Sequence, residues 1–284
     1  MSKTKFNKNS LLGTVYVLLS AVCFSLGGVL IKAIPWSSPS VNGIRCFFSF
    51  FVRLIYQKIR GRKLRFNKMI VLGALLNFVM LMAFVAATKM TTAANAIVLQ
   101  FTEPVFLILL LWIIYKQKPQ KEAVITCFFV LCGIICFFFD SLSPGKMVGN
   151  LLAILSGITY AGVFLIKKFP DGDFESSLLI SYVMCVLVGI PSFVSETTFT
   201  VPVWICAVIL GVVQNGISYI FLSKGLDRVS PVTASLTSVI EPVLNPVLVA
   251  LFCHETIGPM GVAGAVLVII SSAVYNMRQA KLPQ

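Results

Sequence analysis

Thr102-Glu103-Pro104-Val105-Phe106 and Ile240-Glu241-Pro242-Val243-Leu244 are the two stretches that decide the fold of this 284-residue chain. Each places a glutamate and a proline in the middle of a long apolar segment, and the two stretches lie 138 positions apart. At the same offset, residues 87–115 align with residues 225–253, and a second match at an offset of 136 relates the starts of the two halves. The chain therefore contains a duplicated unit, which in membrane proteins is typical of solute carriers.

The composition indicates an integral membrane protein. Hydrophobic residues make up 58% of the chain and charged residues only 12%, whereas soluble proteins have about 25% charged residues. About 20 apolar residues in a helix cross a bilayer. We therefore predict an all-α integral membrane fold with ten transmembrane helices, at residues 11–31, 41–56, 69–87, 92–115, 123–139, 147–166, 176–194, 201–223, 231–253 and 257–275.

An odd number of helices in each half predicts an inverted repeat. The second five-helix unit enters the membrane from the opposite side, so the halves are related by a pseudo-two-fold axis in the membrane plane. The first apolar segment has no small-residue cleavage site after it, and we interpret it as a retained helix. The expected organisation is an N-terminal cap over residues 1–10, a first repeat over 11–139, a second repeat over 147–275 and a tail over 276–284.

The basic residues predict the orientation. Of the 23 lysines and arginines, all but Lys32, Arg45, Lys89 and Lys146 fall on one side of the predicted topology. By the positive-inside rule this side is cytoplasmic, with both termini inside and the protein in the cytoplasmic membrane. The net charge of +13 is thereby explained without nucleic-acid binding, which we do not expect.

The duplicated motifs resemble the drug/metabolite transporter superfamily in its ten-helix EamA-like branch. The residues that carry the resemblance are Ala93-Ala94-Asn95-Ala96 before the first Glu-Pro, the run from Leu226 to Ala234 before the second, and His254-Glu255. One departure is Lys116-Gln117, where the first half lacks the counterpart of Glu255. The resemblance implies a secondary transporter that exports metabolites or amino acids by alternating access. It leaves the coupling ion, whether a proton or another ion, and the choice between monomer and homodimer open.

Glu103 and Glu241 are the first candidate site residues. An ionised carboxylate at mid-membrane depth is costly, so both side chains are expected to face the protein interior. They either bind a proton or a solute amine, or they brace the helix breaks that Pro104 and Pro242 produce by removing an amide donor. Pro246, beside Asn245, adds a second break to the ninth helix, which we therefore expect to line the solute path.

Other polar and aromatic side chains within the spans are further candidates. Arg45 either meets an anionic group of the solute or extends to the lipid head groups. The amides either line a cavity or join helices by hydrogen bonds, and the aromatic rings either form cavity walls or pack at the interface. These candidates are Asn77, Gln100, Gln214, Asn215, Trp112, Tyr160 and Tyr219.

Two alternative functions fit the sequence less well than transport. An intramembrane enzyme acting on a lipid or polyprenyl group would need a cluster of catalytic groups, and the chain has one histidine and no evident nucleophile with a base nearby. A non-transporting receptor would not need acids at mid-membrane depth in both halves. The eight cysteines lie in or at the end of apolar segments, and His254 is far in sequence from Cys132 and Cys136, so neither a metal site nor a cofactor is expected.

The predicted orientation can be tested with a single cysteine. We expect Asn67→Cys, in a cysteine-free background, to resist a membrane-impermeant thiol reagent added to intact cells and to react once the cells are opened. Labelling in intact cells would show that the loop from Lys58 to Lys68 lies outside.

Overall fold

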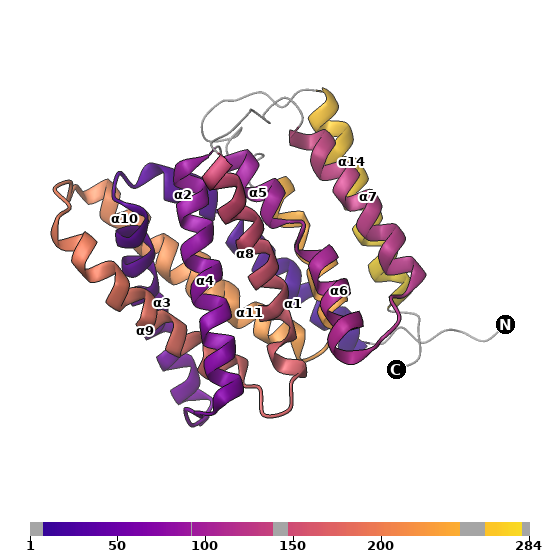
Figure 1. The fold of residues 1–284 in the computed structure, drawn as a ribbon, viewed down its shortest axis with the longest axis horizontal. Helices are drawn as coiled ribbons and strands as arrows, with labels where there is room; N and C mark the ends of the chain where they lie inside the picture. Colours follow the sequence, from indigo (N-terminus) through magenta and orange to yellow (C-terminus); the bar gives the residue numbers. More distant parts are fainter. Residues whose placement is uncertain (1–7, 92, 139–146, 245–258, 280–284) are drawn as a thin grey trace.

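The computed structural model describes residues 8–91, 93–138, 147–244 and 259–279, and all regular secondary structure in these ranges is helical (Figure 1). The prediction of an all-helical membrane protein is confirmed. Within the described ranges, six helical stretches are long and apolar enough to cross a bilayer. They are Lys8–Ala33, Lys68–Met90, Met147–Lys168, Phe174–Val194, Val201–Leu226 and Pro259–Arg278.

The first half contains seven helical pieces. Ser25 interrupts the first predicted span, and its hydroxyl donates a hydrogen bond to the Val22 carbonyl at 2.7 Å. Asn67 starts the third span by accepting a hydrogen bond from the Ile70 amide at 2.8 Å. The pieces are α1 (Lys8–Phe24), α2 (Gly27–Ala33), α3 (Ser38–Ile59), α4 (Lys68–Met90), α5 (Ala93–Gln100), α6 (Glu103–Tyr115) and α7 (Lys121–Phe138).

The first Glu-Pro motif divides the fourth predicted span into two helices. Pro104 occupies the first turn of α6, where its missing amide costs nothing, and α5 ends at Gln100. Thr102, between the two helices, donates its hydroxyl to the Leu99 carbonyl at 2.6 Å. The predicted break thus lies at residues 101–102, directly before the motif.

The second half contains a π-helix that the apolar pattern does not predict. The pattern predicts one α-helix over residues 201–223, but this stretch divides into α10, the π-helix η3 and α11. A π-helix takes more residues per turn than an α-helix and often marks a functional position. The pieces of this half that lie wholly within the described residues are α8 (Met147–Leu165), η2 (Ile166–Lys168), α9 (Phe174–Val194), α10 (Val201–Ile209), η3 (Leu210–Ile217), α11 (Ser218–Leu226), α12 (Pro231–Ser238) and α14 (Pro259–Gln279).

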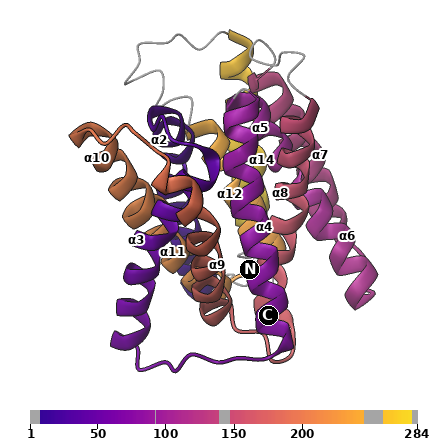
Figure 2. The same cartoon turned by 60° about the vertical axis from the view of Figure 1, so that its left-hand side comes forward.

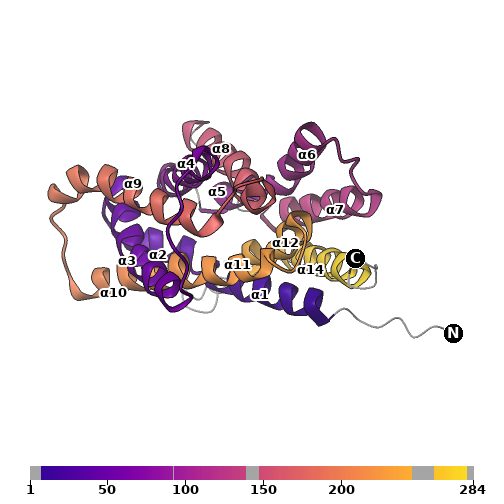
Figure 3. The same cartoon turned by 90° about the horizontal axis from the view of Figure 1, so that it is seen from below.

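The helices of the two halves pack in matching pairs. The second spans of the halves, α3 and α9, pack on each other, and so do the fifth spans, α7 and α14. The third span of each half packs on the first span of the other, as α4 on α8 (Figures 2 and 3) and α11 on α1 (Figure 3). The main helix contacts are therefore symmetric with respect to the two halves.

Glycines permit a close contact between the backbones of the two halves. A Cβ atom on Gly189 in α9 would lie 2.7 Å from the Gly43 Cα atom in α3. Small residues at such crossings let helix backbones approach each other in a membrane, where the hydrophobic effect does not drive helices together. The α3–α9 contact is therefore a backbone-level seam between the halves.

Candidate functional site

A small cavity lies between the halves, in the centre of the bundle, and most of the predicted site residues line it. Its volume is about 30 Å³, room for roughly one water molecule. Four apolar wall residues, Phe24, Met80, Leu81 and Phe84, are not among the candidates that the sequence indicates. The predicted residues that line the cavity are Arg45, Gln100, Tyr160, Gln214, Asn215, Tyr219 and Glu241.

Arg45 is inside the protein and does not extend to the head groups. Its side chain is 1% exposed, its Nε donates to Asn42 Oδ1 at 2.8 Å, and a terminal nitrogen donates to the Leu81 carbonyl at 3.4 Å. Among the described residues no carboxylate forms an ion pair with it. The cavity wall thus carries a buried guanidinium held by neutral acceptors, a suitable partner for an anionic group.

Two asparagines, one in each half, form equivalent hydrogen bonds to the other half. Asn77 Nδ2 in α4 donates to Ser181 Oγ in α9 at 2.6 Å, and Asn215 Nδ2 in η3 donates to Ser49 Oγ in α3 at 2.8 Å. The two asparagines are 138 positions apart, the offset of the Glu-Pro motifs. A leucine-glycine pair precedes each of them, with Gly73 four residues before Asn77 and Gly211 four residues before Asn215. This shared spacing is a sequence signal that could have identified the pair.

Side chains satisfy the backbone of the π-helix. Ser49 Oγ donates to the Gly211 carbonyl at 2.8 Å, and the Tyr182 hydroxyl donates to the Asn215 carbonyl at 3.1 Å. Non-helical backbone is tolerated at membrane depth where neighbours supply such donors. The π-helix places the adjacent amides of Gln214 and Asn215 at the same cavity. Gln214 Oε1 is buried there without a hydrogen-bond partner among the described residues.

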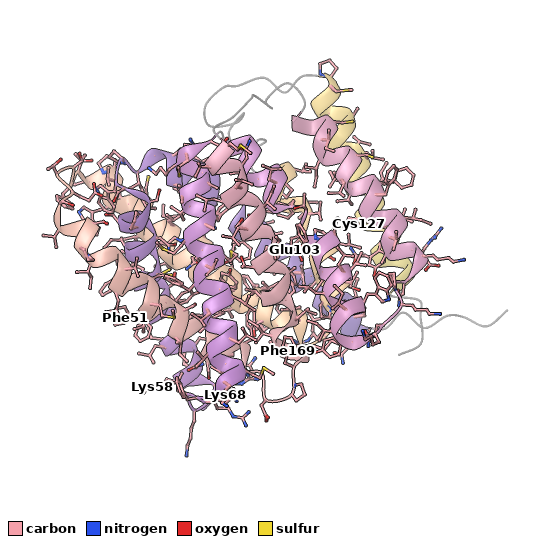
Figure 4. All side chains as sticks on the ribbon, viewed as in Figure 1. Phe51, Lys58, Lys68, Glu103, Cys127 and Phe169 are labelled. Carbon is pink, nitrogen blue, oxygen red and sulfur yellow. The ribbon has the colours of Figure 1, made fainter. Side chains whose placement is uncertain are left out.

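The two glutamates have different surroundings. Glu241 lines the cavity. Glu103, labelled in Figure 4, is 1% exposed, lies outside the cavity lining and accepts a hydrogen bond from Ser235 of the other half at 2.8 Å through Oε2. Its second oxygen is buried without a partner in the part of the chain that the structure describes. Of the two glutamates, only Glu241 therefore lines the cavity in this conformation.

The carbonyl that Pro104 leaves without a helical partner is covered by a glycine. A Cβ atom on Gly157 would lie 2.7 Å from the Gln100 carbonyl oxygen, so α8 packs directly on the freed group. Pro242, beside Glu241, is buried. Glu103 accepts its hydrogen bond from Ser235 of the other half, so this bond joins the halves.

Some predicted site residues do not reach the cavity. Asn77 is one hydrogen bond away, because the Tyr219 hydroxyl donates to its Oδ1 at 3.3 Å. Trp112 is 54% exposed on α6, so its interpretation as a cavity wall does not fit this structure, and it belongs to the outer surface. Asn245 and Pro246 lie outside the described residues.

One end of the bundle is here called the basic end, and Lys58, Lys68 and Phe169 mark it in Figure 4. Buried charged side chains join the two halves at this end. Arg53 of α3 pairs with Glu175 of α9, and these side chains are 0% and 2% exposed. The Ser223 hydroxyl of α11 also donates to Glu175. Because these groups belong to both halves, separating the halves here would expose a buried ion pair.

At the opposite end, here called the Trp36 end, aromatic rings close the gap. Trp36 Nε1 donates to the Thr198 carbonyl at 2.7 Å, and its ring packs on Phe193, Phe199 and Trp204. Glu196 accepts hydrogen bonds from the Ser37 amide at 2.8 Å and hydroxyl at 2.7 Å. Partial burial acts to raise the pKa of Glu196, but these hydrogen bonds prevail and lower it. This contact is therefore weakened when acid protonates the carboxylate.

The fold and the cavity define a class: a helical membrane protein with a duplicated core and a central cavity lined by polar and apolar residues of both halves. The sequence profile of the EamA-like transporter family matches residues 11–139 and 147–277, and the chain belongs to this family. The expected resemblance is confirmed, and the protein is a multi-pass membrane protein of the transporter class.

Relatives and one solved structure agree with this membership. The chain is 25% identical to an uncharacterized transporter from Archaeoglobus fulgidus over 264 residues, which cover 90% of this chain and 93% of the relative. It is 29% identical to human solute carrier family 35 member G1 over 189 residues, 60% of this chain and 52% of the relative. A crystal structure with 17% identity covers 94% of this chain and 95% of its own, with a TM-score of 0.77, and shows the same fold.

The Arg53–Glu175 pair gives a stability prediction. Glu175→Gln leaves Arg53 buried without a counter-charge, which should lower the free energy of unfolding by about 3–5 kcal/mol. Replacing both residues, as Arg53→Met with Glu175→Leu, should restore most of the loss. The measurement is the thermal unfolding midpoint of the purified protein in detergent.

Asp227→Asn is the matched control, because Asp227 is 46% exposed in its 2.6 Å pair with Lys167 and such pairs contribute little. Equal midpoints for Glu175→Gln and the parent would show that the buried pair does not hold this end together.

Proposed function

We propose that the chain is a secondary transporter that moves a small organic solute, a metabolite or an amino acid, across the cytoplasmic membrane by alternating access. Ten helices form two inverted five-helix repeats, residues 11–139 and 147–275, and both termini lie in the cytoplasm. The net direction is export, as the family resemblance implies. The protein works without a cofactor, in a lipid bilayer.

The observation that carries the proposal is the central cavity and the origin of its polar groups. Arg45 and Gln100 come from the first half, and Gln214, Asn215 and Glu241 come from the second. A cation, a carboxylate and three amides around one space provide partners for both ends of a polar solute. Aromatic rings from both halves supply apolar walls. Binding sites of carriers lie at such interfaces between repeats.

The closure of both ends supports alternating access. The cavity is too small for an organic solute, so a solute can bind there only after the halves move apart. Opening the basic end requires separation of Arg53 from Glu175, and opening the Trp36 end requires separation of Trp36 from Phe193 and Trp204. The two ends use unrelated contacts, so one can open while the other stays closed.

The matching helix pairs support two conformations of similar energy. Because α4 packs on α8 as α11 packs on α1, each half can adopt the arrangement of the other with the same kinds of contacts. The hydrogen bonds of Asn77 to α9 and of Asn215 to α3 join the halves on both sides of the α3–α9 seam in the same way. Rocking about the seam would expose the cavity to each side in turn.

Glu241 should matter more for transport than Glu103. Glu241→Gln keeps the size and the hydrogen-bonding capacity of the side chain but removes its charge and its titration, so solute flux into proteoliposomes should fall at least tenfold. Glu103→Gln should retain most of the flux, because the amide oxygen still accepts from Ser235. The measurement is uptake of labelled amino acids and amines from pH 6 to 8.

Both variants need the elution profile and unfolding midpoint of the parent to be compared. If Glu241→Gln transports like the parent across this pH range while Glu241→Ala fails to fold, the glutamate is a structural brace and its chemical role is refuted.

A further inference from the structure

A second, larger hollow lies at the basic end, outside the central cavity. Its volume is about 810 Å³. One wall is the α3–α4 connection of the first half, and the other is the η2–α9 connection together with the end of α11 in the second half. The residues that line it are Arg62, Lys63, Leu64, Arg65, Lys167, Gly172, Asp173, Phe174, Leu226 and Asp227.

Three cations of this hollow have no partner of their own among the described residues. Arg62, Lys63 and Arg65 are exposed, and neither an acid nor an aromatic ring pairs with their side chains in the described ranges. Lys58 and Lys68 at the same end are likewise exposed without an ion pair or a ring contact among the described residues, but five other cations there differ in this respect. Lys224 lies over the rings of Tyr16 and Tyr56, and the others pair as Arg60 with Tyr56, Arg228 with Tyr16, Lys168 with Tyr115 and Lys167 with Asp227.

The acids of the hollow are already occupied. Asp227 binds Lys167 at 2.6 Å. Asp173 caps α9, accepting from the Glu175 amide at 3.1 Å and from the Ser176 hydroxyl at 2.7 Å. The lining carries four cations, Arg62, Lys63, Arg65 and Lys167, against these two acids, so the hollow has an excess of positive charge that attracts an anion.

The rim of the hollow is held in place by hydrogen bonds between the halves. The Arg65 amide donates to Ser176 Oγ at 3.1 Å, and Asn67 Nδ2 donates to the Asp171 carbonyl at 2.9 Å. These bonds fix the backbone of the cationic run against the second half. Ordering the run in advance reduces the entropy cost of binding a ligand there.

Exposed apolar side chains alternate with the cations. Leu64 is 60% exposed and Phe66 is 78% exposed, on either side of Arg65. A soluble anion gains nothing from such neighbours, whereas at a membrane surface they enter the acyl boundary while the cations meet head groups. The apolar side chains thus favour a ligand that carries a phosphate and a hydrocarbon chain.

We propose that this hollow is a binding site for the phosphate of an anionic phospholipid, held by Arg62, Lys63 and Arg65. Its acyl chains lie along Leu64 and Phe66. The bound phosphate neutralises the cationic run beside the second-half loop, and it thereby stabilises the closed basic end. The site is independent of the central cavity and of the identity of the transported solute.

The test compares unfolding midpoints of the purified protein in detergent after addition of phosphatidylglycerol, phosphatidylcholine or inorganic phosphate. Phosphatidylglycerol should raise the midpoint of the parent more than phosphatidylcholine does, and about 0.5 M NaCl should reduce the difference because salt screens the charges. The triple variant Arg62→Ala, Lys63→Ala, Arg65→Ala should lose the difference while its midpoint without lipid stays near that of the parent.

The matched control replaces three cations that do not line the hollow, as Lys58→Ala, Lys121→Ala and Arg278→Ala, and removes the same charge. It should keep the response to phosphatidylglycerol. An equal loss in both triple variants would overturn the site in favour of general surface attraction. An equal shift with inorganic phosphate would overturn the assignment to lipid in favour of a soluble phosphate, and a parent without any lipid difference would refute the proposal.

Discussion

Buried polar side chains must find their partners inside a membrane protein, because lipid offers none. In this chain several of them find partners across the boundary between the two halves. Asn77 reaches Ser181, Asn215 reaches Ser49, and Glu103 accepts from Ser235. Neither half can satisfy these groups alone, so the same hydrogen bonds assemble the bundle and locate the cavity at its centre. The glycine contact between α3 and α9 brings the two backbones close together, so that these hydrogen bonds can form.

The duplication gives both halves the same helix arrangement, and the positions at which the halves differ form the candidate site. Both halves carry a Glu-Pro motif and an asparagine at the same offset, yet only the second half contains a π-helix among the described residues. This stretch turns Gln214 and Asn215 toward Arg45, whereas the first half presents Leu76 beside Asn77 at the corresponding positions. Glu241 faces the cavity while its counterpart bonds a neighbouring helix. A symmetric scaffold thus carries an asymmetric binding surface.

The sequence predicts the parts of this structure that depend on local chemistry. Apolar length locates the helices, Pro104 places a break within two residues of where it occurs, and the duplicated motif marks Glu241 at the cavity. The π-helix could not be predicted, since it depends on donors from Ser49 and Tyr182 that are distant in sequence. The burial of Arg45 and the outward position of Trp112 could not be predicted either. They depend on how each helix is rotated about its axis, which the composition of the helix does not determine.

The central claim is that the space around Gln214 opens to each side of the membrane in turn. The most direct test is the reaction of Gln214→Cys, in a cysteine-free background, with an impermeant thiol reagent in right-side-out and inside-out vesicles. Alternating access predicts labelling from both sides. It also predicts that a disulfide between cysteines at Arg65 and Ser176, whose backbone amide and hydroxyl lie 3.1 Å apart across the basic end, abolishes labelling from that end alone. Labelling from one side only without the disulfide, or from both sides with it, would contradict alternating access through this cavity.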